Sequence, residues 1–387
     1  MDILLGVLVG LFILVVLVAI HELGHGIVAR RNGVNVEEFG IGFPPRAWAR
    51  KVKTSILGKN VLYTLNWLPL GGFVKLQGEH DADKGKGDYG AASFWAKTKI
   101  LLAGVVMNWL AAVVLFTILA VVGMPKLVDG QFSVAGDTRT ESSAPTVSFI
   151  SPDSPADKSA LKIGDEIIKV NDNKLADASE LAEVTEQAKG ETIEITYQRE
   201  GETATTTAEL RANNDDGQGF LGASAGQQTL MYSTWSAPIV GVGLTGQLTW
   251  LTFEGLGSTL VSFVSGVAQK LVPNADVQEQ ANQNLTKASQ NVAGPVGLLG
   301  VILPNLLDAG LRYLILIAGV ISLSLAALNA LPIPALDGGR WFVTALYRVL
   351  KRPLTPEREE QIHGYGFMAL MGLFVLITIA DVGKITG

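Results

Sequence analysis

The sequence predicts a multi-pass α-helical membrane protein with four transmembrane helices, a re-entrant β-hairpin and an inserted α+β domain on the extracytoplasmic side. Three observations support this fold class. Hydrophobic residues occupy 48% of the 387 positions, which is too many for an ordinary protein that folds in water. Long apolar segments recur along the chain, and the first begins near Ile3. Between two of them, from about Pro125 to Met231, the chain becomes polar and acidic.

Composition also limits the possible functions. The chain has no cysteine, which excludes disulfides and thiolate metal ligands, so a metal must be bound by histidine and carboxylate side chains. The formal net charge is −6, and no cluster of basic residues lies beside aromatic residues. We therefore expect no nucleic-acid partner.

The first apolar segment carries the strongest motif, His21-Glu22-Leu23-Gly24-His25. On a helix from about Ile3 to Ala29, residues four apart share a face, so His21 and His25 can offer two imidazoles to one metal. Glu22 lies beside them, where its carboxylate can take a proton from a metal-bound water. This pattern is typical of zinc metalloproteases. The alternative is a helix end with two hydrogen-bonded histidines, but ionisable groups near the centre of an apolar span cost roughly 2.5 kcal/mol or more each, which favours a functional site.

The distribution of basic residues predicts the orientation of the chain. Residues 1–30 form the first transmembrane helix, because no basic segment precedes it and no cleavage site of small residues precedes Arg30. Lysine and arginine are frequent in the next segment, residues 31–96, which predicts a cytoplasmic loop and an N-terminus on the outside. The histidine motif then lies towards the cytoplasmic end of its helix.

Within this loop, residues 60–76 favour a β-hairpin. β-Favouring residues lie on both sides of a turn at Pro69-Leu70-Gly71-Gly72. Because the segment is apolar, it can dip into the membrane beside the metal, where an unpaired strand edge at Gly71, Gly72 and Phe73 can hold an extended substrate. An ordinary hairpin that packs on the first helix is the alternative.

Residues 97–123 form the second transmembrane helix. Its run Ala103-Gly104-Val105-Val106-Met107-Asn108 contains small residues that allow helices to approach closely. Since Asn108 would be costly against lipid, we expect it to face the first helix.

Residues 124–231 form the extracytoplasmic region, and its core, residues 144–223, resembles a PDZ domain of the permuted bacterial-protease type. The resemblance rests on short strands, two small helices and the Gly164-Asp165 turn, in that order. Gly219-Phe220-Leu221-Gly222 resembles the glycine-rich turn before the peptide-binding strand. The resemblance implies that an extended peptide binds by strand addition. An inert spacer is the alternative.

The rest of the chain supplies two more crossings. Residues 232–309 are assigned to the extracytoplasmic side as membrane-surface helices and a loop. Residues 310–337 form the third transmembrane helix, 338–364 a cytoplasmic loop, and 365–383 the fourth transmembrane helix. The apolar stretch from Thr245 to Gly266 is not counted as a transmembrane helix. A crossing there would put Asp337, the predicted third metal ligand, on the opposite side of the membrane from His21 and His25.

Asp337 is the predicted third metal ligand. A catalytic zinc takes three protein ligands and one water, so the first helix leaves one ligand to be found. Pro332 and Pro334 break the third helix near the cytoplasmic surface, where the irregular backbone can direct Asp337 inward. His80 and His363 lie in polar segments and rank below it.

Together these features resemble the site-2 protease family, in particular the bacterial regulator-of-sigma-E protease type. They follow the family's order along nearly the whole chain: the histidine motif, the Leu70–Lys75 loop, the PDZ-like insert, Gly294-Pro295-Val296-Gly297, and the Asn329–Gly339 motif. The chain departs from the family in having room for one PDZ domain, where some relatives have two, and in Ser159-Ala160-Leu161 within that domain.

The resemblance implies an intramembrane endopeptidase that holds Zn²⁺ with His21, His25 and Asp337 and uses Glu22 as general base. It also implies a substrate-orienting or oxyanion role for Asn329, beside Pro332; a helix-capping role for Asn329 is the alternative. The implied substrates are single-span membrane proteins already trimmed on the outer side, such as anti-sigma factors, or signal-peptide remnants. The implied location is the bacterial plasma membrane, with lipid around the helices.

A catalytically inactive, membrane-anchored PDZ scaffold is the competing interpretation. The presence of both the ligand set and the water-activating Glu22 argues against it. A transporter is disfavoured, because the spans do not repeat and only one polar group of residues lies within them.

Overall fold

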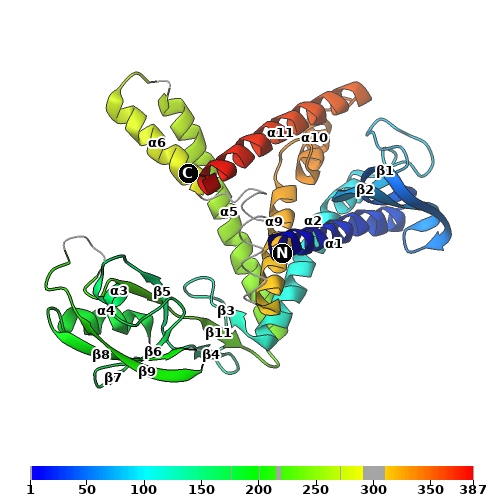
Figure 1. Ribbon diagram of the computed structural model, residues 1–387. Helices are drawn as coiled ribbons and strands as arrows, with labels where there is room; N and C mark the ends of the chain where they lie inside the picture. Colours follow the sequence, from blue (N-terminus) through cyan, green and yellow to red (C-terminus); the bar gives the residue numbers. More distant parts are fainter. Residues whose placement is uncertain are drawn as a thin grey trace. The chain divides into compact units, whose positions relative to one another are not determined.

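The computed structural model describes residues 2–175, 177–199, 201–214, 219–270, 272–290 and 310–386. The chain divides into two compact units (Figure 1). The first unit contains residues 1–119 and 237–387, and the second contains residues 120–236. The motif Gly294-Pro295-Val296-Gly297 lies outside the described residues.

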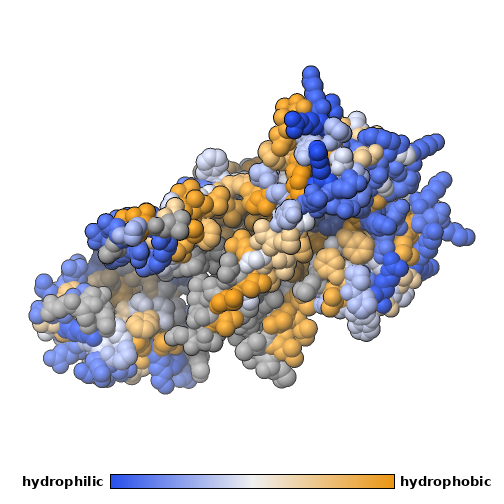
Figure 2. All heavy atoms as spheres, turned by 90° about the horizontal axis from the view of Figure 1, so that it is seen from above, coloured by the Kyte–Doolittle hydropathy of each residue, from blue (hydrophilic) through white to orange (hydrophobic). Residues whose placement is uncertain are grey.

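The first unit is built on long helices. Their bounds are α1 Asp2–Arg31, α2 Phe94–Val122, α5 Ala237–Lys270, α6 Ala275–Gln290, α9 Leu311–Ala330, α10 Asp337–Val349 and α11 Pro356–Thr386. Within the described residues, five of these helices (α1, α2, α5, α9 and α11) are long and apolar enough to cross a membrane. Large apolar side chains remain exposed along them (Figure 2), as expected for surfaces that face lipid. The chain is therefore a multi-pass membrane protein.

Helix α5 is more regular than the expected surface segment, since it runs without a break for 34 residues. Near its start, Gly241 packs so closely on Val113 and Thr117 of α2 that a Cβ would overlap them. Further along, Nε1 of Trp109 donates to Oγ1 of Thr249 at 3.2 Å. Helix α5 thus runs antiparallel to α2 at least to the middle of α2. That the segment returns without crossing stays a prediction.

The loop between α1 and α2 contains a long antiparallel strand pair, β1 (Val36–Ser55) and β2 (Gly58–Leu76). Both strands bend, so residues 38–41 of β1 pair with residues 62–65 of β2 on one side and with residues 72–75 on the other. The prediction of a hairpin within residues 60–76 is therefore wrong in its pairing, because β1 lies between the two arms. Pro44-Pro45 and several charged residues mask the strand pattern of β1 in the sequence.

The third predicted helix ends earlier than expected. Helix α9 ends at Ala330 rather than near 337, because Pro332 has no N–H to donate and Leu331, just before it, disfavours helical backbone. Residues 331–336 are irregular, and Ala335 has a φ of 80°. Asp337 is instead the first residue of α10, which occupies part of the segment expected to be a loop.

The second unit is an α+β domain around one main sheet. The strand order is β10-β5-β6-β8-β9, with β7 paired to β6. The bounds are β5 Thr146–Ile150, β6 Glu166–Val170, β7 Asn173–Lys174, β8 Thr192–Arg199, β9 Glu202–Glu209 and β10 Ala223–Gly226, with helices α3 Pro155–Lys158 and α4 Ala178–Gln187. A smaller sheet joins β3 Met124–Pro125, β11 Thr229–Tyr232 and β4 Arg139–Ser142. Ile167, Ile193 and Ile195 are fully buried in the core of this domain.

The Gly164-Asp165 turn is anchored by an ion pair between the buried Asp165 and the partly exposed Arg199. Nε and Nη2 of Arg199 each donate to one carboxylate oxygen of Asp165 at 2.6 Å. Burial acts to raise the pKa of Asp165, but the bonds from Arg199 and from the backbone N–H of Lys162 outweigh it and hold the pKa below its ordinary value. The pair therefore stabilises the domain at neutral pH, and its contribution is lost only as the pH falls through this lowered pKa.

Candidate metal centre

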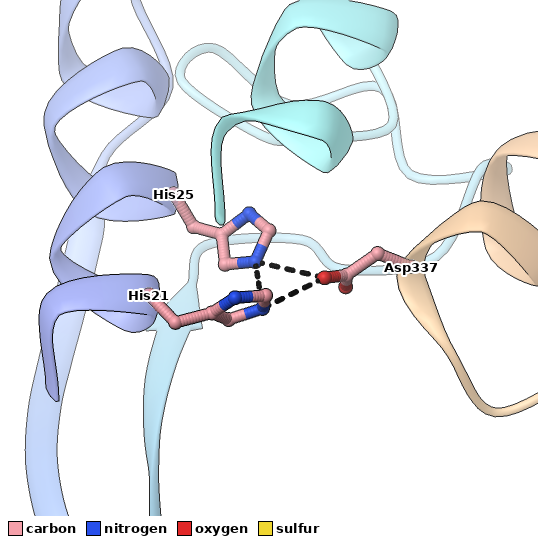
Figure 3. A group of neighbouring side chains, drawn as sticks. All are labelled: His21, His25 and Asp337. Atoms are coloured by element: carbon pink, nitrogen blue, oxygen red, sulfur yellow. Dashed lines mark hydrogen bonds and ion pairs between the residues drawn. The ribbon is translucent and has the colours of Figure 1, made fainter. Parts of the chain in front are cut away.

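Three side chains from two distant helices of the first unit meet at one point (Figure 3). His21 and His25 project from one face of α1, and Asp337 from the start of α10. Oδ2 of Asp337 lies 2.9 Å from Nε2 of His21 and 3.1 Å from Nε2 of His25, and the two nitrogens are 3.2 Å apart. All three ligand atoms lie within 4.8 Å of one another, so they can share one metal ion.

The surroundings of His25 select the tautomer that metal binding requires. Nδ1 of His25 lies 2.7 Å from the backbone oxygen of Ile100, on α2. A carbonyl oxygen only accepts, so Nδ1 carries a proton and Nε2, which faces Asp337, is the nitrogen that can bind a metal. A histidine held in this way is typical of metal sites.

His21 is held by Asn108, which faces the first helix as predicted. The side-chain amide of Asn108 is completely buried and lies 3.3 Å from Nδ1 of His21. Among the described residues, Oδ1 of Asn108 has no hydrogen-bond partner. With the amide turned so that Oδ1 accepts from Nδ1–H of His21, Nε2 of His21 is the nitrogen that can bind a metal. Lone pairs of two imidazoles and a carboxylate then converge, an arrangement that a cation stabilises.

Replacing Asn108 with leucine is expected to weaken zinc binding by about 10–100-fold, because His21 loses the partner that orients it. Asn108→Asp keeps the acceptor and is expected to stay within a few-fold of the wild type. Competition against a chelator measures the affinity. If Asn108→Leu holds zinc as tightly as the wild type, Asn108 has no role in orienting His21.

A glycine on α2 leaves the space beside the two histidines open. A Cβ at Gly104 would lie 2.5 Å from Nε2 of His21, and closer still to Nε2 of His25. Both nitrogens are the atoms that face Asp337. A side chain at Gly104 would therefore overlap both ligand nitrogens, and the donor set of two imidazoles and a carboxylate fits zinc.

Glu22 lies between the histidines and the edge of β2. Its Oε2 accepts a hydrogen bond from the backbone N–H of Val74 at 3.0 Å. This N–H points away from β1, so the backbone of Gly72, two residues earlier, points the same way. A Cβ at Gly72 would lie 3.8 Å from Cγ of Glu22. The strand edge and the Glu22 carboxylate thus lie side by side.

The other predicted site residues have different surroundings. Nδ2 of Asn329 donates to the carbonyl of Leu325, one turn earlier on α9, at 3.0 Å. Pro332 lies in the irregular segment after α9. Gly71 has a φ of 81°, which favours glycine. The ring of Phe73 packs over Gly40 of β1, so this side chain contributes to packing within the sheet.

The two lower-ranked histidines are engaged elsewhere. Nε2 of His80 lies 3.2 Å from Glu360. Nδ1 of His363 accepts from the N–H of Ala335 at 3.0 Å. Within the described residues, the metal-compatible group contains neither.

Sequence reasoning missed two contributors to this site. Gly104 was noted only as a small residue, although it lies next to the predicted ligands. The carbonyl of Ile100 is a backbone group, and no residue type in the sequence marks it.

Comparison with known proteins agrees with this geometry. The chain matches the profile of peptidase family M50 over residues 9–373. A protein of Clostridium perfringens, provisionally named a zinc metalloprotease, is 30% identical, and the match covers 95% of each chain. A similarly named protein of Campylobacter jejuni is 30% identical over 96% of this chain and 91% of its own. The zinc metalloprotease RasP of Geobacillus kaustophilus is 23% identical over 95% of each chain.

Among solved structures, the PDZ domain of an SdrC-like protein from Listeria monocytogenes is similar to part of the chain. The match has 23% identity and a TM-score of 0.20, and it covers 21% of this chain and 87% of that domain. The profile match extends over nearly the full length and includes every residue of the candidate metal centre. The chain belongs to peptidase family M50, the site-2 protease family, and is a membrane zinc metalloprotease.

Proposed function

We propose that the chain is an intramembrane endopeptidase that cleaves single-span membrane proteins within or near their transmembrane segment. His21, His25 and Asp337 hold the zinc in this proposal. The observation that carries it is the convergence of three ligand atoms within 4.8 Å, next to the carboxylate of Glu22. A scaffold without activity would need neither the converging lone pairs nor the open volume at Gly104.

Bound zinc supplies an acidified water and polarises the scissile carbonyl. Glu22 takes the proton from the attacking water and delivers it to the leaving amine. The Ile100 carbonyl orients His25 through its Nδ1–H, and Asn108 contacts Nδ1 of His21, so the Nε2 atoms of both rings face the metal position. Asn329 has a role in orienting the substrate near Pro332 once it exchanges its bond to Leu325 for one to the substrate.

The edge of β2 at Gly71, Gly72 and Phe73 positions the substrate in this proposal. A transmembrane helix hides its peptide bonds in internal hydrogen bonds, so the cleaved segment must unwind first. An unwound segment can pair with the outward backbone groups beside Glu22. The hydrogen bond between Glu22 and Val74 supports this position of the substrate, because it puts the edge of β2 next to the proposed general base.

Replacing Gly72 with proline is expected to reduce cleavage about tenfold or more while zinc stays bound, because it removes an outward N–H that pairs with substrate. The pairing with β1 uses the alternate residues and is retained. Turnover and zinc content are measured on the same preparation. Equal turnover with full zinc content would remove this edge from the mechanism.

The second unit acts in the proposal as a PDZ domain on the extracytoplasmic side. A groove of about 570 Å³ lies between α4 and β10, and its lining includes Leu181, Phe220 and Ala225. β10 is the terminal strand of its sheet, so an extended peptide can add to its edge. The proposed topology has four spans in a bacterial plasma membrane, with the metal site towards the cytoplasm. On the outer side, the PDZ domain admits only substrates that have already been trimmed there.

The function is tested by co-expression with candidate single-span membrane proteins, each in full-length and outer-side-trimmed form. Membranes that contain wild-type chain are compared with membranes that contain Glu22→Gln. The proposal expects soluble cytoplasmic fragments only with the wild type and only from trimmed substrates. Fragments in equal amounts from both chains would contradict the assigned activity, and fragments from untrimmed substrates would contradict the role of the PDZ domain.

A further inference from the structure

Beside the start of α10, Arg340, Glu359, Asp81, Lys97 and Tyr89 form a closed ring of contacts. Arg340 lies one helical turn after Asp337, and its Nη2 donates to the backbone oxygen of Glu79. Nε of Arg340 lies 3.5 Å from Oε1 of Glu359 on α11. Its guanidinium carbon lies 5.0 Å from the centre of the Tyr89 ring. One side chain on α10 therefore reaches the loop after β2 and α11 at once.

The ring closes through two more residues. The backbone N–H of Asp81 donates to Oε2 of Glu359 at 2.9 Å, and the carboxylate of Asp81 pairs with Lys97 on α2. Nζ of Lys97 lies 5.4 Å from the centre of the same Tyr89 ring. The Glu359 side chain is only 5% exposed. Partly buried charges that are paired in this way are much less screened by salt than surface pairs.

Tyr89 contributes through its ring rather than its hydroxyl. Its residue is 2% exposed, and Oη has no hydrogen-bond partner among the described residues. Burial raises the pKa of Tyr89, so the hydroxyl is neutral at physiological pH. Two cations, on Arg340 and Lys97, thus lie within cation–π distance of one buried aromatic ring.

The same helix α10 is also tied to α2, the helix that orients the histidines. Nε1 of Trp341 donates to Oγ1 of Thr98 at 3.0 Å. Two residues further along α2, the carbonyl of Ile100 accepts from His25. Helix α2 therefore contacts both α1, which carries the histidines, and α10, which carries Asp337.

We propose that Arg340 is a positioning residue that holds Asp337 opposite His21 and His25 before the metal binds. The inference rests on the proposed role of Asp337 as a zinc ligand. The segment before Asp337 is irregular and is tied to α11 by the hydrogen bond from Ala335 to His363, and the contacts of Arg340 hold the start of α10 from the other side of Asp337. The ring around Arg340 restricts the movement of the start of α10 and so reduces the ordering cost of metal binding.

The proposal is tested on the full chain in detergent, with Arg340→Ala and with Arg348→Ala as matched control. Arg348 is on the same helix, and its guanidinium packs on Phe94 rather than on Tyr89. In the first measurement, hydrogen–deuterium exchange of residues 335–345 is followed after zinc removal. In the second, the rate of zinc loss to a chelator is followed.

We expect Arg340→Ala to exchange at least tenfold faster at the start of α10 in the metal-free protein and to lose zinc about 10–100-fold faster. Arg348→Ala is expected to match the wild type within about twofold in both measurements. Activity of Arg340→Ala at saturating zinc is expected to recover towards the wild type, because excess zinc restores the occupancy of the site.

A second pair of variants covers the case in which Arg340→Ala fails to fold. Tyr89→Phe keeps the aromatic side chain between Arg340 and Lys97 and is expected to behave as the wild type. Tyr89→Leu removes the aromatic side chain and is expected to lose zinc faster. Unchanged zinc loss and unchanged exchange in both Arg340→Ala and Tyr89→Leu would overturn the proposal. Such a result leaves the proposed function intact, because that function fails only if wild-type chain does not bind zinc or if Glu22→Gln still cleaves.

Discussion

Replacing Glu22 with glutamine is expected to lower the rate of peptide cleavage by about 10²–10⁴-fold while zinc stays bound. Glutamine has nearly the same shape as glutamate but cannot accept the proton of the attacking water. The hydrogen bond from the N–H of Val74 can still form, because the amide oxygen of glutamine accepts it. The local structure is therefore retained, and only the proton transfer is lost.

The measurement compares turnover of one trimmed single-span substrate with zinc content, on the same purified protein. Glu37→Gln is a suitable control, because Glu37 lies at the start of β1 and pairs with Lys75 in an exposed ion pair. The control is expected to cleave like the wild type. If Glu22→Gln lost both zinc and activity, Glu22 would be needed to hold the metal rather than to transfer the proton of the attacking water.

Replacing Gly104 with alanine is expected to remove zinc binding almost completely. The added methyl would lie 2.5 Å from Nε2 of His21 and would also overlap Nε2 of His25, so it occupies the volume next to both ligand atoms. Either the histidines rotate away from Asp337 or α1 and α2 separate. Each result breaks the ligand set, and catalysis falls with it.

Gly246→Ala is the matched control, since a Cβ at Gly246, on α5, would have nothing within 4 Å. Both changes add one methyl group to an apolar helix. Zinc content by metal analysis and cleavage of a trimmed substrate are measured for both variants. Full zinc content in Gly104→Ala would mean that the ion lies away from this face of the histidines.

Several features of the site followed from the sequence because they depend on local spacing. Two histidines four residues apart share a helix face wherever that helix lies, so the pairing of His21 with His25 could be predicted. The choice of Asp337 depended on its predicted depth at the cytoplasmic end of the third transmembrane helix, and the structure brings this carboxylate to the two histidines. The inward direction of Asn108 followed from the cost of an amide against lipid.

The strand pairing in the loop could not be predicted in the same way. The β2 arms were identified from their composition, but a strand pattern does not state which partner lies beside it. β1 inserts between the arms, and Pro44-Pro45 and its charged residues hide its strand character. The end of α9 was placed too late, because the prolines mark a break without stating where the last helical hydrogen bond forms.

The sequence alone determined the chemistry available to this protein: a membrane helix with two imidazoles and a carboxylate, no thiols, and an acidic insert. These properties depend on residue type and on spacing within one helix. Only the tertiary structure decided which groups surround the ligands. The Ile100 carbonyl, the empty space at Gly104 and the ring around Arg340 come from segments far apart in the chain, and contacts of that kind depend on how helices pack rather than on local sequence.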